Sequence, residues 1–108
     1  MNMQKITNIA EFEELVESNE PFFLLKHSTT CPVSAAAYSQ YQSFVEDPSF
    51  DKKGVYLAVQ ESRELSNHIA QITNIRHESP QVIYFTDGKA QWNESHWKIT
   101  KDQLISVQ

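Results

Sequence analysis

The feature that most constrains the fold of this chain is the alternation of short apolar runs with amphipathic stretches. The runs lie at Phe22–Lys26, Val55–Val59 and Val82–Thr86, and none of them is long enough for a helix. Short continuous apolar runs of this kind are typical of strands that are buried on both faces of a sheet. Because helical patterns separate the runs, the alternation predicts a mixed sheet with helices on both faces.

Periodicity and capping residues predict four helices. Asn8 with Glu11 forms a capping-box pattern, and Thr100 repeats the pattern with Gln103. Pro32 suits the first position of a helix, because the N–H group that proline lacks would have no partner there. The predicted helices cover about residues 9–18, residues 32–46, the stretch between Ser62 and Asn74, and the residues after Thr100.

The C-terminal part of the chain departs from the alternation. Asp87-Gly88 is a strong signal for a two-residue hairpin, so we expect the strand at Val82–Thr86 to pair antiparallel with a strand near Lys89–Asn93. A short strand near Met3–Thr7 would add a fifth, and residues 94–98 receive no assignment. We therefore expect a single α/β domain over residues 1–108, with four to five strands and about four helices.

Composition excludes several classes of function. The chain has 9 basic and 14 acidic residues, a net charge of −5, and no basic cluster that would favour nucleic-acid binding. The two glycines, Gly54 and Gly88, are too few and too far apart for a nucleotide-binding loop. No apolar run approaches the length of a membrane span, and Met1–Lys5 lacks the hydrophobic stretch of a signal peptide. We expect a cytoplasmic monomer.

A single cysteine, Cys31, limits disulfide and metal chemistry. It excludes a disulfide within the chain and every zinc site that needs two or more thiolates. The four histidines contain no i, i+4 pair, and a pairing of Glu64 with His68 on a helix would more often be a surface contact than a metal site. We expect no tightly bound metal or cofactor.

Cys31 stands between the strand at Phe22–Lys26 and the helix that Pro32 opens, which predicts that it is a helix N-cap. The positive end of the helix dipole would stabilise its thiolate there, and Lys26 and His27 could add positive charge nearby. Ser34, one turn along, could reach the sulfur with its hydroxyl or its N–H. A stabilised thiolate is above all a good leaving group in disulfide exchange. The alternative is that Cys31 is a small buried hydrophobic residue.

The segment before the strand at Val82–Thr86 is a second candidate region. Ser79-Pro80 would normally be read as a trans proline that opens a strand. If the first and third apolar runs are neighbours, however, the turn at Pro80 lies beside Cys31 and can offer its backbone to a disulfide substrate. Arg76, His77 and Glu78 either contact the substrate or, more commonly for such residues, are solvated loop charges.

The two tryptophans also allow two interpretations. Trp92 and Trp97 could be exposed contact residues, but large aromatic side chains more often pack in a core or along a hairpin. We therefore expect both side chains to be packed.

Three motifs carry a resemblance that covers nearly the whole chain. They are Thr30-Cys31-Pro32-Val33-Ser34, His77-Glu78-Ser79-Pro80-Gln81 and Ser95-His96-Trp97. With these motifs the chain resembles the YtxJ-type monothiol bacilliredoxins, also called bacilliredoxin C. The resemblance implies a thioredoxin-like fold, a reactive Cys31 at the start of the second helix, and a cis-proline at Pro80 that faces it.

The resemblance also implies a function. The family removes bacillithiol from S-bacillithiolated proteins in the cytoplasm of bacteria that use this thiol, so S-bacillithiolated proteins would be the partners and bacillithiol the co-substrate. Cys31 would be catalytic, and Pro80 would face it. From their places in the sequence, we expect Thr30, Pro32 and Ser34 to surround the thiolate, and Ser79, Pro80, Arg76 and His77 to bind substrate. Because Ser34 occupies the place of a resolving cysteine, a second bacillithiol or another protein thiol must release the adduct.

Two other functions remain open at this stage. A non-catalytic thioredoxin-like module would bind a partner protein through its loops and would not need Cys31. An iron–sulfur cluster carrier of the monothiol glutaredoxin type is less favoured, because Pro32 is bulkier than the glycine found there and has no N–H to offer a cluster sulfide.

Overall fold

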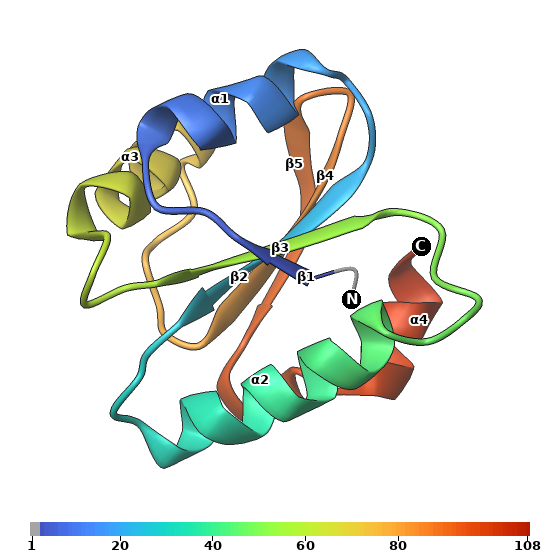
Figure 1. Ribbon diagram of the computed structural model, residues 1–108. Coiled ribbons are helices and arrows are strands. Elements are labelled where there is room, and N and C mark those ends of the chain that lie inside the picture. The colour runs from blue at the N-terminus through green and yellow to red at the C-terminus, as the bar shows by residue number, and fades with distance from the viewer. Residues whose placement is uncertain (1–2) are drawn as a thin grey trace.

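The computed structural model of the protein describes residues 3–108 and contains one sheet with helices on both of its faces (Figure 1). The strands are β1 (Met3–Lys5), β2 (Phe22–His27), β3 (Lys53–Ala58), β4 (Gln81–Thr86) and β5 (Lys89–Ser95). The helices are α1 (Ile9–Glu17), α2 (Pro32–Val45), α3 (Arg63–Thr73), the short 3₁₀ helix η1 (His96–Lys98) and α4 (Lys101–Val107).

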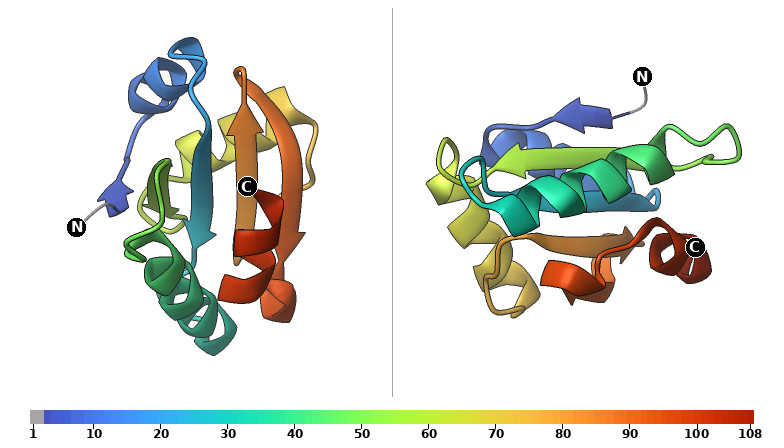
Figure 2. Two further views of the ribbon diagram at one scale, coloured as in Figure 1. Left: turned by 90° about the vertical axis from the view of Figure 1, so that its right-hand side faces the viewer. Right: turned by 90° about the horizontal axis from the view of Figure 1, so that it is seen from below.

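The strand order in the sheet is β1-β3-β2-β4-β5. Strands β1 and β2 each pair parallel with β3, whereas β4 is antiparallel to both β2 and β5. Helices α1 and α3 cover one face, and α2 and α4 cover the other, as the views in Figures 1 and 2 show. The predicted α/β class and mixed sheet are confirmed.

The central strand β2 explains why two layers of helices are needed. Side chains alternate between the faces of a strand, so Phe22 and Leu24 join the core beneath α1 and α3, while Phe23 and Leu25 join the core against α2. All four are buried, and burying an apolar side chain of this size contributes about 1.5–3 kcal/mol. This strand therefore fixes the position of the loop that follows it at His27.

The local signals for helix and turn also agree with the structure. Asn8 caps α1, because its side-chain oxygen accepts a hydrogen bond of 2.9 Å from the N–H of Glu11. At the hairpin, Asp87 and Gly88 have φ values of 53° and 73°, the left-handed pair that a type I′ turn requires. The stretch 94–98, left unassigned above, contains the end of β5 and the helix η1.

The strand expected at Val55–Val59 begins two residues earlier in the structure, at Lys53. The strand includes Gly54, where a larger residue would not fit: a Cβ atom there would come within 2.6 Å of a methyl carbon of Val45. Sequence periodicity missed this extension, since a lysine and a glycine carry no strand signal of their own.

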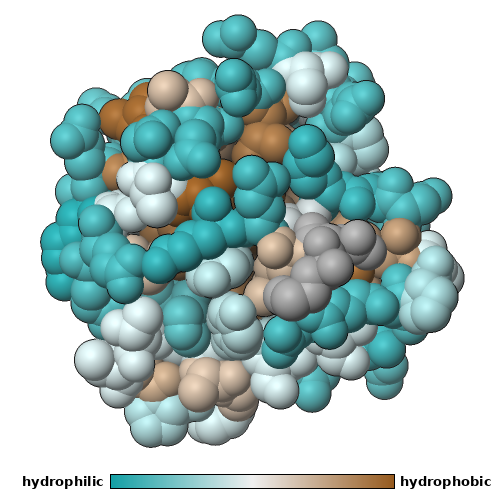
Figure 3. All heavy atoms as spheres, in the orientation of Figure 1, coloured by the Kyte–Doolittle hydropathy of each residue, from teal (hydrophilic) through white to brown (hydrophobic). Residues whose placement is uncertain are grey.

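The surface in Figure 3 is mostly hydrophilic, and apolar residues show mainly in a hollow below α1. A groove of about 290 Å³ lies between α1 and the β1–β3 edge, lined by residues that include Ile6, Leu15 and Lys53. Within residues 3–108, no helix has the length and apolar character that a bilayer-spanning segment needs.

Candidate active site at Cys31

Cys31 is the N-cap of α2, as the sequence predicted, with extended backbone angles of φ −106° and ψ 124°. Its carbonyl accepts the first helical hydrogen bond, 3.0 Å from the N–H of Ala35. Its side chain makes no capping hydrogen bond and is partly exposed. The interpretation of Cys31 as a buried hydrophobic residue is therefore wrong, and the sulfur lies at the positive end of a helix within reach of solvent.

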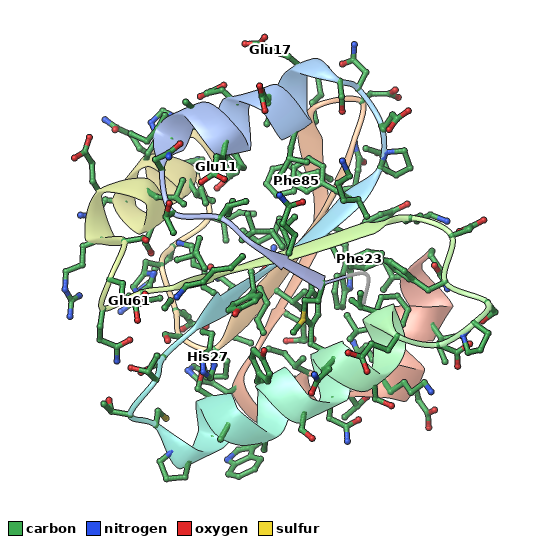
Figure 4. The ribbon with its side chains drawn as sticks, viewed as in Figure 1. Glu11, Glu17, Phe23, His27, Glu61 and Phe85 are labelled. Carbon is green, nitrogen blue, oxygen red and sulfur yellow. The ribbon has the colours of Figure 1, made fainter. Side chains whose placement is uncertain are left out.

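Ser34 forms its hydrogen bond with the loop before Cys31 and not with the sulfur. Its hydroxyl is fully buried, accepts a hydrogen bond of 2.7 Å from the N–H of Ser28 and lies 3.2 Å from Nδ1 of His27. Figure 4 shows His27 near the first turns of α2. Its ring packs near Tyr38, with 4.8 Å between centroids, and burial lowers the pKa of His27. The hydroxyl that we expected at the sulfur is thus used to fold the chain back from β2 into α2.

Gln60 holds the same loop from the other side and was missed by sequence reasoning. Its Oε1 accepts a hydrogen bond of 3.1 Å from the N–H of Thr29, and its Nε2 donates to the hydroxyls of Ser28 (2.8 Å) and Thr30 (3.2 Å). Gln60 follows β3, which runs parallel to β2, so both strands end at the same edge of the sheet. A polar residue directly after a neighbouring parallel strand was the signal that could have found it.

Pro80 lies at this edge as well, because Gln81 pairs with Lys26 across β4 and β2. The Ser79-Pro80 bond is cis, as the resemblance implied, and the reading of an ordinary trans proline is wrong. The carbonyl of Pro80 accepts a hydrogen bond of 3.0 Å from the N–H of His96. Pro80 is buried, and the hydroxyl of Ser79 is buried without a hydrogen-bond partner among residues 3–108.

Lys26 does not supply charge to the sulfur as expected. Its position in β2 directs it to the face under α1 and α3, opposite α2, where it is fully buried. Its Nζ donates to the carbonyl of Ser66, at 3.1 Å, and lies 3.2 Å from Nδ1 of His77. Burial lowers the pKa of Lys26 to about 8.

The other predicted loop residues lie between α3 and β4. Arg76 is exposed, and its carbonyl accepts a hydrogen bond of 3.0 Å from Nε2 of Gln81. His77 is exposed, and its Nδ1 lies 3.2 Å from the hydroxyl of Ser66. Glu78 is half-buried, with one carboxylate oxygen 3.9 Å from Nδ1 of His96. Of the side chains of Arg76, His77 and Glu78, only that of His77 thus contacts buried residues.

The two tryptophans differ. Trp92 is partly buried against the core, as expected, but Trp97 in η1 is 70% exposed, so the expectation that it is packed is wrong. His96, directly before it, has φ 58°, a left-handed conformation that few residues other than glycine adopt but that histidine tolerates better than most. A groove of about 280 Å³ lies between this segment and α2, and its lining includes Val33, Ala36 and Trp97.

His68, which the spacing would allow to pair with Glu64, lies 2.7 Å from the carboxylate of Glu13 on α1. In the part of the chain that the structure describes, no three His, Cys, Asp or Glu side chains gather as metal ligands would.

Solved structures share this architecture. A thioredoxin from Schistosoma mansoni has a TM-score of 0.75 at 18% identity, covering 97% of this chain and 95% of that one. A Malassezia sympodialis thioredoxin has a TM-score of 0.78 at 18% identity, covering 99% and 90%. A candidate oxidoreductase with a thioredoxin fold has a TM-score of 0.90 at 44% identity, covering 97% and 92%. The fold and the cysteine at the start of α2 define a thioredoxin-like thiol-disulfide oxidoreductase.

The family is narrower than this class. The sequence model described as monothiol bacilliredoxin BrxC matches residues 4–104, which is nearly the whole chain. The protein therefore belongs to the monothiol bacilliredoxin family. This membership confirms the resemblance drawn from the three motifs around Cys31, Pro80 and Trp97.

Proposed function

We propose that the protein removes bacillithiol from S-bacillithiolated proteins in the cytoplasm, with Cys31 as the catalytic nucleophile. Bacillithiol is then a co-substrate that forms a mixed disulfide with the protein. The observation that carries the proposal is a partly exposed cysteine at the start of α2, without a second thiol in the chain, in a member of the bacilliredoxin family.

The reaction consists of two thiol-disulfide exchanges. In the first, the thiolate of Cys31 attacks the bacillithiol sulfur of the mixed disulfide on the S-bacillithiolated substrate protein, here called the client. A new S–S bond forms between Cys31 and bacillithiol, and the client cysteine leaves as a thiolate. In the second, the thiolate of another bacillithiol attacks the bacillithiol sulfur on Cys31, which forms bacillithiol disulfide and returns Cys31 as a thiolate. Overall, the client cysteine is reduced, one free bacillithiol is consumed, and it leaves as a disulfide with the bacillithiol that came from the client.

The second step depends on an external thiol because Ser34 is not a resolving residue. Its hydroxyl is buried and bonded to the N–H of Ser28, and an alcohol cannot form a disulfide in any case. The helix dipole at Cys31 favours the departure of its thiolate when the external thiol attacks. The turn at Ser79 and Pro80 would bind the backbone of the client beside the sulfur.

The proposal is tested by the rate at which bacillithiol is removed from an S-bacillithiolated test protein, followed by intact mass in excess bacillithiol. The wild-type protein should accelerate removal over bacillithiol alone, and Cys31→Ser, which removes the single thiol and little volume, should abolish the acceleration. No acceleration by the wild type, or acceleration that survives Cys31→Ser, would contradict the proposal. The second result would favour a binding module that acts without Cys31.

A further inference from the structure

Among residues 3–108, Lys26 is the only charged residue that is buried. In the sheet, Lys26 pairs with Gln81 of β4 and Leu57 of β3. An apolar side chain would fill this place at lower cost, since a buried ammonium group must give up its hydration. The residues that its amine contacts therefore indicate what the charge does.

Those contacts lead to the segment 76–80. The carbonyl of Ser66, 3.1 Å from Nζ, lies within α3, but Nδ1 of His77, 3.2 Å away, lies in irregular chain between α3 and β4. The hydroxyl of Ser66 lies 3.2 Å from the same Nδ1, and Gln81 donates to the carbonyl of Arg76. Three buried polar side chains, those of Lys26, Ser66 and Gln81, thus hold one short segment.

This segment ends at the candidate active site. It continues through Glu78 and Ser79 to Pro80, whose partner strand β2 leads into the loop before Cys31. We propose that Lys26 is a positioning residue for the exchange reaction: its buried amine holds His77 in place, and through His77 the segment that carries Ser79 and Pro80. The inference rests on the proposed function, in which this turn binds the client.

The contact also has a built-in dependence on pH. Two donors, the amine of Lys26 and the hydroxyl of Ser66, converge on Nδ1 of His77, which accepts only while the imidazole is neutral with its proton on Nε2. Burial lowers the pKa of His77, the charges of Lys26 and Arg63 lower it further, and Glu78 raises it. As the pH falls through the lowered pKa of His77, its Nδ1 gains a proton, can no longer accept from the ammonium group of Lys26, and the hold on the segment is lost.

A double-mutant cycle tests the inference. Lys26→Met removes the amine and keeps the chain length, and His77→Leu breaks the same contact from the exposed side, where folding is not at risk. We expect each substitution to lower kcat/KM for the S-bacillithiolated test protein about tenfold, and the double variant to be no slower than either. A product of the two effects, about a hundredfold, would show that the residues act independently and would overturn the inference. Lys53→Met, at an exposed lysine of β3, is the matched control.

Two readouts separate this inference from failure of the proposed function. Amide hydrogen exchange of residues 76–79 should be at least tenfold faster in Lys26→Met while the amides of β4 are unchanged, whatever the substrate. The ratio of wild-type to Lys26→Met rates should also fall towards one as the pH drops through the lowered pKa of His77. If the wild type is inactive but amide exchange changes as expected, the proposed function is refuted and the role of Lys26 in holding the segment stands. Unchanged amide exchange at residues 76–79 would overturn the role of Lys26.

Discussion

The buried amine of Lys26 makes the stability of this protein depend on pH in a way that can be worked out. Burial lowers the pKa of Lys26 from 10.5 to about 8. Below pH 8 the amine is charged in both the folded and the unfolded chain, so folding bears the full cost of burying the charge. Between pH 8 and 10.5 the unfolded chain holds a proton that the folded chain has released, so the free energy of unfolding rises with pH.

The magnitude follows from 1.36 kcal/mol for each pKa unit. The difference of about 2.5 units, 10.5 minus 8, corresponds to a burial cost of about 3.4 kcal/mol, of which about 2.5 kcal/mol is recovered between pH 7 and pH 10. In Lys26→Met this contribution is absent. The wild type should therefore gain about 2.5 kcal/mol relative to Lys26→Met over this range of pH.

Urea denaturation of both proteins at pH 7, 8, 9 and 10 measures this difference. The other groups that titrate in alkaline solution, such as Tyr41, are common to both proteins and cancel in the comparison. The hydrogen bonds that Lys26→Met loses shift the difference by a constant amount and leave its slope with pH unchanged. A difference that stays flat from pH 7 to pH 10 would refute the reasoning, because it would mean that the amine is hydrated in the folded protein.

Three further substitutions test the packing that supports the site. Tyr41→Phe removes a buried hydroxyl 2.7 Å from the carbonyl of Val55, and urea denaturation should show a loss of about 1–3 kcal/mol; no loss would contradict the contact. Gly54→Ala brings a Cβ within 2.6 Å of Val45, so the melting temperature should fall by the equivalent of about 1–3 kcal/mol rather than rise. Ser34→Ala takes the acceptor from the N–H of Ser28, whose amide should exchange faster.

Much of the fold was predictable because its signals are local. The apolar run at Phe22–Lys26 is too short for a helix, and the positions of Pro32 and of Asp87-Gly88 depend on backbone preferences of the residues themselves. Cys31 could be placed at the start of a helix for the same reason. These features follow from a few neighbouring residues and need no knowledge of the rest of the chain.

The contacts of the site were less predictable because they join distant residues. Gln60 reaches the loop at Thr29 only because β3 lies beside β2, and Lys26 reaches His77 across 51 positions of sequence. A lysine at the end of an apolar run was expected near the thiol, but the alternation of faces along β2 directs it away from α2. Trp97 was expected to be packed, and only the tertiary position of η1 leaves it exposed.

The central claim is that one partly exposed cysteine passes through a mixed disulfide and is released by an external thiol. Intact-mass analysis of the protein after incubation with bacillithiol disulfide, and again after excess reduced bacillithiol, tests it most directly. We expect the mass to rise by one bacillithiol on Cys31, with no adduct in Cys31→Ser, and to return to that of the free protein in the second step. A wild-type protein that takes up no bacillithiol, or that keeps the adduct in excess thiol, would contradict the account.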